Sequence, residues 1–245
     1  MLFLTTRSKR RFFHDLGLAS LLSMAAGAVN SAGFFAFDVL TTNVTGHMAL
    51  LANDLVADNW KAASMKALWM MLFLFGAFMS SFIMQLLRNF PLIASIIPLL
   101  LEIVILSVIT YLGYYFYEYS LTISQVLTGG LLFAMGLQNA LITITSGAVI
   151  RTTHLTGLFT DLGVNLAHFL FPSHKERENN DKKKLTLLLT IAISFFMGGI
   201  TGGFLFASYL FLAFLFPIIL LNFALLYEII TSYKNRRKVK KGLLK

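Results

Sequence analysis

The chain has 245 residues, of which 57% are hydrophobic and 13% are charged, whereas a soluble domain carries about 25% charged residues. Its net charge of +9 comes from basic residues gathered in three stretches, at 5–11, 173–184 and 233–241. Aromatic side chains do not interleave with them as in single-strand binding surfaces, so nucleic acid is excluded as a partner. The composition predicts an all-α integral membrane protein with one membrane domain, 1–245. Zero cysteines exclude disulfides and thiolate metal sites.

Apolar runs that can cross about 30 Å of hydrocarbon, roughly 20 residues each, define the expected spans. They cover residues 15–37, 66–88, 92–117, 122–148, 185–208 and 210–231. Two shorter segments, 44–57 and 155–171, follow the first and fourth spans and are too short to cross as helices. If these segments are broken spans, the chain crosses eight times; if they are re-entrant, it crosses six times. Both versions place the N-terminus, the loop 173–184 and the basic tail 232–245 in the cytoplasm, facing anionic headgroups.

Four landmarks recur in the same order along the chain, which indicates two homologous halves, 15–117 and 122–231. The pairs are TTNVTGHM (41–48) with TTHLTGLF (152–159), GAVN (27–30) with GLQN (136–139), FGAFMSSF (75–82) with MGGITGGF (197–204), and IIPLLLE (96–102) with LFPIILLN (215–222). The last pair matches Pro98 with Pro217 and Glu102 with Asn222. Because the first span is part of a repeat, it is not a cleaved signal peptide. The repeats are parallel with eight crossings or inverted with six, and the lysine and arginine counts leave both open.

The motifs AGAVNSAGF (26–34), TTNVTGH (41–47), GLQNA (136–140) and TTHLTG (152–157) resemble those of the YoaK family of bacterial multi-pass membrane proteins. The resemblance covers nearly the whole chain. It implies a protein of the bacterial cytoplasmic (inner) membrane and no assigned substrate or activity. Where the family often has an acidic residue, this chain has Asn30, which puts a proton or cation role at that position in doubt.

The two TxxTG elements are the main candidates for a binding site. Each leads into a short helix expected to begin near Thr45 or Thr156, whose hydroxyls suit N-capping. Non-helical chain at membrane depth survives only inside protein or beside a wet cavity, so the two helix starts are expected to face one another and to hold polar or anionic groups. The predicted pocket residues are Asn30, Thr42, Asn43, Thr45, Gly46, Asn139, Thr153, His154, Thr156 and Gly157. The alternative is ordinary helix capping.

Glu102 is the strongest candidate for proton coupling, because it stands about 15 Å into an apolar span with no neighbouring charge. A carboxylate near the bilayer centre costs at least about 2.5 kcal/mol, so it must be protonated, paired or facing water. The alternative is a structural hydrogen bond made by the neutral acid. Asp161 and Asp54 are further coupling candidates; Asp161 shares a helix face with Asn165 and His168.

These features predict a secondary transporter of a small polar solute, possessing a midplane pocket at the repeat interface and one half that rocks against the other. The alternatives are a non-transporting membrane scaffold or assembly protein and, third, a channel. No nucleophile, base and metal set appears, and His47 and His154 lack a carboxylate at ligand spacing, so we expect no enzyme, metal or cofactor. The lipid bilayer is the expected partner, and a homo-oligomer is left open.

Overall fold

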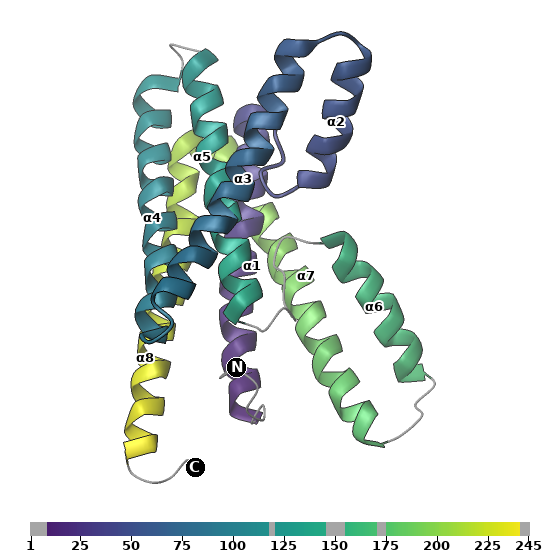
Figure 1. Ribbon diagram of the computed structural model, residues 1–245, viewed down its shortest axis with the longest axis vertical. Coiled ribbons are helices and arrows are strands. Elements are labelled where there is room, and N and C mark those ends of the chain that lie inside the picture. Colours follow the sequence, from purple (N-terminus) through teal and green to yellow (C-terminus); the bar gives the residue numbers. More distant parts are fainter. Residues whose placement is uncertain (1–8, 118–120, 146–154, 171–174, 241–245) are drawn as a thin grey trace.

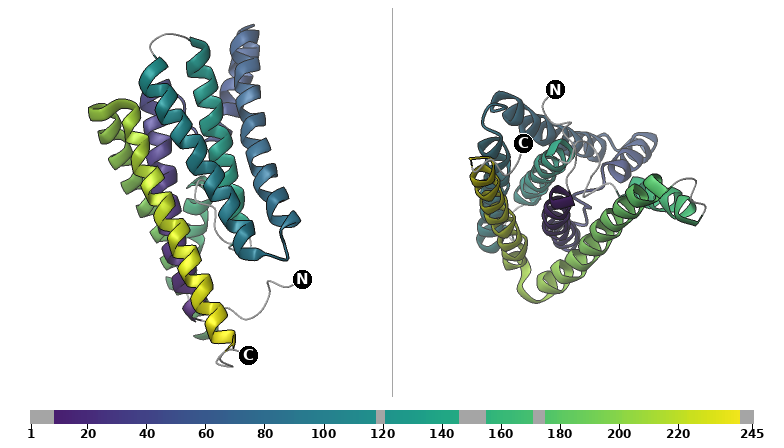
Figure 2. Two further views of the ribbon diagram at one scale, coloured as in Figure 1. Left: turned by 90° about the vertical axis from the view of Figure 1, so that its left-hand side faces the viewer. Right: turned by 90° about the horizontal axis from the view of Figure 1, so that it is seen from below.

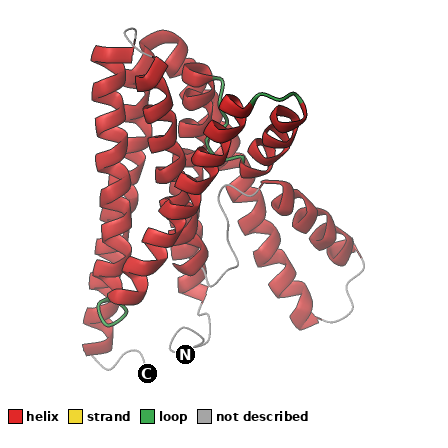
Figure 3. Cartoon of the chain, turned by 45° about the horizontal axis from the view of Figure 1, so that its top comes forward, coloured by secondary structure: helices red, strands yellow, loops and turns green. Residues whose placement is uncertain are grey.

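The computed structural model describes residues 9–117, 121–145, 155–170 and 175–240, and these are helical apart from short turns (Figures 1 and 3). The expected all-α architecture is confirmed for this part of the chain. The elements in order are α1 (Lys9–Phe37), α2 (Val44–Val56), α3 (Trp60–Leu86), α4 (Pro91–Phe116), α5 (Leu121–Thr145), α6 (Leu155–Leu170), α7 (Lys175–Tyr209), the 3-10 helix η2 (Leu210–Phe214) and α8 (Leu215–Lys240).

The two short apolar segments form the two short helices α2 and α6, and their bounds lie within one residue of those expected. The longer helices differ more at their ends. Helix α3 begins at Trp60, six residues before the expected span, because Asn59 caps it by accepting a hydrogen bond from the amide of Ala62. Residues 175–184 of the predicted polar loop belong to α7, and α8 continues into the basic tail as far as Lys240.

Five helical segments within the described residues are long and apolar enough to cross a membrane. Four of them lie in α1, α3, α4 and α5. The fifth, Lys182–Tyr233, is 52 residues long and includes most of α7, all of η2 and most of α8. The chain reverses within it at η2, where Leu210 adopts a positive φ of 51°, and Figure 1 shows α7 and α8 running in opposite directions.

Helices α1, α4, α5 and α8 form a four-helix core, in which α1 packs on α5 and α8, and α4 packs on the same two helices. Helix α7 lies outside α1, and α3 lies outside α5 (Figure 2). The short helix α2 packs beside the upper half of α3, and α6 beside the lower half of α7, both on one side of the bundle in Figures 1 and 3. The outer surface of α3 is apolar and includes exposed Phe75, Phe78 and Phe82.

Two pairs of core helices are antiparallel. Gln138 of α5 donates to the carbonyl of Leu22 midway along α1, whereas Leu131, earlier in α5, lies beside Gly33 near the end of α1. In the second pair, Ser95 near the start of α4 contacts Glu228 midway along α8, and Gly113 near the end of α4 lies against Phe211, just before α8 begins.

The outer helices attach to the core at glycines that bring backbones into direct contact. A Cβ atom on Gly27 of α1 would lie 2.0 Å from the carbonyl oxygen of Phe195, and one on Gly198 of α7 would lie 2.0 Å from that of Met24. Only glycine fits at such distances, which is how small residues allow close packing of membrane helices. The predicted small-residue segments therefore lie at a real helix crossing.

The crossing of α3 with α5 has the same geometry. A Cβ atom on Gly76 would lie 2.1 Å from the carbonyl oxygen of Phe133, and one on Gly136 would lie 2.1 Å from that of Phe73. The two crossings use glycines that the sequence alignment matches, Gly27 with Gly136 and Gly76 with Gly198.

Candidate functional site

The segment between α1 and α2 turns back along α1 instead of leaving the helix bundle. Asp38 has a positive φ of 54°, which reverses the chain just after α1 ends. Thr41 then lies beside Gly33, and Thr42 reaches the side chain of Asn30. The chain has therefore returned about two helical turns, roughly 10 Å, before α2 begins.

Three contacts hold this return segment, residues 38–43. The amide and hydroxyl of Thr42 both donate to Oδ1 of Asn30, at 3.1 and 2.9 Å. Nε2 of His47 lies 3.0 Å from the carbonyl oxygen of Leu40, and the His47 ring is buried edge-on against Trp69. His47 thus fastens the return segment through its ring, and no group of three potential metal ligands occurs in the described ranges.

Helix α2 begins at Val44, and its N-cap is Asn43, not Thr45 as predicted. The Asn43 side chain accepts a hydrogen bond of 2.9 Å from the amide of Gly46. Asn43 takes this role because the cap residue precedes the first helical residue, and Thr45 is already inside the first turn. The Thr45 side chain is exposed, and Gly46 is half-buried.

Helix α6 begins at Leu155, so Thr156 and Gly157 occupy the same first-turn positions as Thr45 and Gly46. Thr156 is exposed and Gly157 is half-buried, as in the first copy. The predicted pocket residues Thr153 and His154 lie outside the described residues. Asn139, which the alignment matches with Asn30, lies in α5, and its buried Oδ1 has no hydrogen-bond partner in the described part of the chain.

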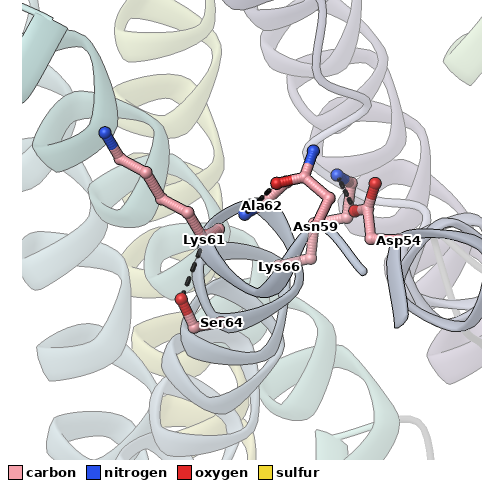
Figure 4. A network of polar contacts seen from close by, with 6 residues as sticks. All are labelled: Asp54, Asn59, Lys61, Ala62, Ser64 and Lys66. Carbon is pink, nitrogen blue, oxygen red and sulfur yellow. Dashed lines mark hydrogen bonds and ion pairs between the residues drawn. The ribbon is translucent and has the colours of Figure 1, made fainter. Parts of the chain in front are cut away.

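An ion pair joins each short helix to the long helix that follows it. Lys66 of α3 pairs with Asp54 of α2 (Figure 4), and Lys184 of α7 lies 3.8 Å from Asp161 of α6. Asp54 and Asp161, both predicted to couple ions, are thus each placed beside a lysine. Asn165 is buried and donates to the carbonyl of Asp161, while the Asp161 side chain is half exposed.

Glu102 lies on the buried face of α4 and is fully buried. Neither of its carboxyl oxygens has a hydrogen-bond partner among the described residues. The predicted match of Glu102 with Asn222 is wrong, because Glu102 is buried whereas Asn222 is exposed. The Asn222 side chain donates to the carbonyl of Ile218. Counting from Pro98 and Pro217 without a gap matches Glu102 with Leu221, which is also fully buried.

Gln138 is a buried polar residue that the sequence did not single out. Its side chain is fully buried, Nε2 donates to the carbonyl of Leu22 at 2.9 Å, and Oε1 has no partner in the described part of the chain. The signal for it lay in the GAVN and GLQN match, where Gln138 takes the place of Val29.

A cavity of about 300 Å³ lies at the start of α3. Its polar lining comes from Asn59, Lys61, Lys66 and Gln125, with Trp69 at one side. Figure 4 shows Lys61 pointing away from the Asp54–Lys66 pair, and the hydroxyl of Ser64 donates to its backbone carbonyl. Asp54 balances one of the two lysine charges, so this cavity is only weakly cationic.

The long apolar helices and their apolar outer surface define a multi-pass helical membrane protein. Residues 18–227 match the family described as "Protein of unknown function (DUF1275)", and the chain belongs to that family. The match agrees with the resemblance that the AGAVN and TG motifs indicated. Neither a curated protein nor a solved structure matches the chain.

Proposed function

We propose that this protein is a secondary transporter of a small polar solute, whose pocket lies where α2 and α6 begin. The observation that carries the proposal is the return of Thr42 to Asn30, because it puts non-helical chain about two turns inside the end of a membrane-length helix. Irregular backbone at such depth is typical of binding sites in transporters, where it lines a cavity between repeats.

The proposal includes two inverted halves and six crossings, with α2 and α6 as re-entrant helices. The antiparallel runs of α1 against α5 and of α4 against α8 support it, because parallel repeats would make matched helices parallel. The matched glycine crossings support two equivalent halves, in either orientation. The 52-residue segment that contains α7 and α8 then crosses twice, since one straight helix of that length would measure about 78 Å.

The proposed pocket places first-turn groups of two helices toward the middle of the membrane. Thr45 and Gly46 of α2 and Thr156 and Gly157 of α6 place hydroxyls and first-turn amides there, at the positive ends of the helix dipoles. The amide of Gly46 already donates to Asn43, so the hydroxyls and the remaining first-turn amides are the groups offered to a ligand. Exposure of both threonine side chains leaves them accessible to a ligand. Carboxylate, phosphate or other electron-rich groups suit such an end.

Glu102 is the proposed coupling residue, since a fully buried carboxyl that gains and loses a proton changes the charge of the core by one unit. A buried charge is costly, so deprotonation would favour a conformation that brings water to α4. Asp54 and Asp161 are weaker candidates for the coupling residue, because each carboxylate is placed beside a lysine.

Reconstituted protein tests the proposal. We expect a panel of small anionic and zwitterionic metabolites to include a solute that raises the apparent Tm and enters proteoliposomes, with uptake that depends on a pH gradient. Thr45→Val and Thr156→Val should each lower that uptake, whereas Thr160→Val, one turn further along α6, serves as the matched control. A panel without any stabilising solute, combined with full host function in both variants, would rule the transporter out.

The second candidate is a non-transporting membrane scaffold. The satisfied hydrogen bonds of Asn30, Thr42 and Asn43 favour it, because these side chains serve the fold itself. A scaffold would need the same residues for stability and would show no solute dependence, so the uptake and Tm measurements separate the two candidates.

A further inference from the structure

Among the fully buried polar side chains of the four-helix core, Gln138 and Glu102 have oxygen atoms without a hydrogen-bond partner in the described residues. Gln138 of α5 uses Nε2 to donate to Leu22 of α1, which leaves its Oε1 without a donor. Glu102 of α4 has two oxygens without a donor. Leaving such groups unsatisfied in a dry interior is destabilising, so a pairing that satisfies both is favoured.

The packing of α4 on α5 brings these two residues to adjoining levels. Gly130 of α5 faces Ile105 and Ile109 of α4, since a Cβ atom on Gly130 would lie 3.3 to 4.0 Å from their side chains. Helices α4 and α5 run antiparallel. Counting two turns from Gly130 toward the C-terminus of α5 reaches Gln138, and the α4 residue at the same level is Leu99, two turns before the Ile105–Ile109 contact. The Cα atoms of Glu102 and Gln138 are thus offset by only about 5 Å along the axis.

The side chains close that offset. Helical side chains lean toward the N-terminus of their own helix, so in antiparallel helices Glu102 leans toward the level of Gln138, and Gln138 leans toward the level of Glu102. Both are on inward faces of the core. Around the helix axis, Glu102 lies on the buried stripe of α4 between Ile109 and Gly113. Ile109 faces α5, and Gly113 lies against Phe211 of η2. Gln138 contacts α1 across the core.

Donor counting selects the protonation state. An ionised carboxylate and the amide oxygen of glutamine are both acceptors and cannot pair through these atoms, whereas a neutral carboxyl has one O–H donor. We propose that the Glu102 carboxyl is held protonated and donates to Oε1 of Gln138, which makes the pair a proton-binding site in the four-helix core. The chain of hydrogen bonds then runs from Glu102 through Gln138 to Leu22, joining α4, α5 and α1.

The other half of the molecule has the apolar version of this pair. The proposed repeat matches Gln138 with Val29 and Glu102 with Leu221, and all four side chains are fully buried. The α1–α8 contact, which corresponds to α5–α4, therefore has two aliphatic residues in place of an acid and an amide. Loss or gain of both polar groups together is expected if each requires the other.

The hydrogen-bonded pair does not depend on the proposed transport function, but its role does. In a transporter, the pair would supply one coupling proton per chain, because the aliphatic counterpart in the other half cannot hold a proton. Infrared difference spectroscopy of wild type against Glu102→Gln tests the pair without any transport assay. We expect the difference spectrum at neutral pH to contain the C=O stretch of a protonated carboxyl, with a downshift in D₂O. Carboxylate bands in its place would overturn the proposal.

Gln138→Leu tests the partner. In the Gln138→Leu variant, the Glu102 carboxyl should remain protonated. Its C=O stretch should move to higher frequency, because the hydrogen bond to Gln138 is lost. An unchanged band would show that Gln138 is not the acceptor and would also overturn the pair. Failure of uptake with an intact band would instead count against the transport function alone.

A double-mutant cycle in Tm gives a second readout, using the residues of the other half. Glu102→Leu and Gln138→Val should each lower the apparent Tm by about 4 °C, because each leaves one buried polar group unpaired. The double variant, which reproduces the Leu221 and Val29 pair, should be more stable than either single variant. Losses that simply add would contradict the pairing.

Discussion

Thr42 makes two hydrogen bonds to a single atom, Oδ1 of Asn30, one from its backbone amide and one from its hydroxyl. Asn30 uses only an acceptor in this contact. The contact fixes how far the chain returns along α1 and therefore the depth at which α2 begins.

An acidic side chain at position 30 should preserve this contact, because a carboxylate also accepts both hydrogen bonds. We expect Asn30→Asp to retain most of the stability of the folded protein. Asn30→Leu, which removes the acceptor and leaves two donors unpaired, should lower stability by roughly 2 to 4 kcal/mol. Thermal unfolding in detergent by size-exclusion chromatography measures both, and equal losses in the two variants would refute the acceptor role.

Alanine at the crossing glycines should be severely destabilising. Gly27→Ala and Gly136→Ala would each place a methyl group about 2 Å from a backbone oxygen, at a cost of about 3 kcal/mol or more, since backbone cannot move aside as a side chain does. Gly163 of α6 is the matched control, because nothing lies within 4 Å of its Cβ position. Gly163→Ala should raise stability by up to about 1 kcal/mol through helix propensity. Expression level and Tm would show the contrast.

Six crossings can be distinguished from eight with single cysteines, for which the natural chain, having none, is the background. Ala57→Cys marks the α2–α3 turn, Asn89→Cys marks the α3–α4 turn, and a C-terminal tag provides the reference side. With re-entrant α2 and α6, Asn89→Cys should react with a membrane-impermeant maleimide from the side of the tag and Ala57→Cys from the opposite side. Eight crossings would exchange the two results.

Leu210 adopts the left-handed backbone conformation, with φ of 51°, where α7 gives way to η2. This region costs an ordinary side chain about 1 kcal/mol, and glycine adopts it freely. Because the Leu210 side chain is exposed, we expect Leu210→Gly to keep or slightly raise the Tm. Leu212→Gly, within η2, should lower the Tm. A clear loss in Leu210→Gly alone would mean that its side chain contributes more than its backbone costs.

Apolar run length and the duplicated TG motif were enough to predict the helices and both short segments, because a membrane imposes hydrophobic length directly on sequence. The N-cap was misassigned to Thr45, since threonine and asparagine are both common caps and a two-residue shift of the helix start changes which of them is used. Gln138 was overlooked because a single amide in an apolar span does not by itself indicate a functional site. Its proposed role depends on the packing of α4 against α5, which the sequence does not show. The match of Glu102 with Asn222 failed because one inserted residue in the alignment moves the matched position from the buried face of α8 to its exposed face.

The glycine crossings also determine which parts of the molecule can move as units. Helix α1 is joined backbone to backbone with α7, and α5 with α3, so each close-packed pair takes one helix from either half of the sequence. With their short helices attached, the natural rigid groups are α1, α6 and α7 on one side and α2, α3 and α5 on the other. A boundary cut through the chain near residue 119 would therefore separate both pairs, and neither fragment would contain a complete unit. The two halves of this protein are interleaved. A rearrangement would therefore move the group α1, α6 and α7 relative to the group α2, α3 and α5, and not one half of the sequence relative to the other.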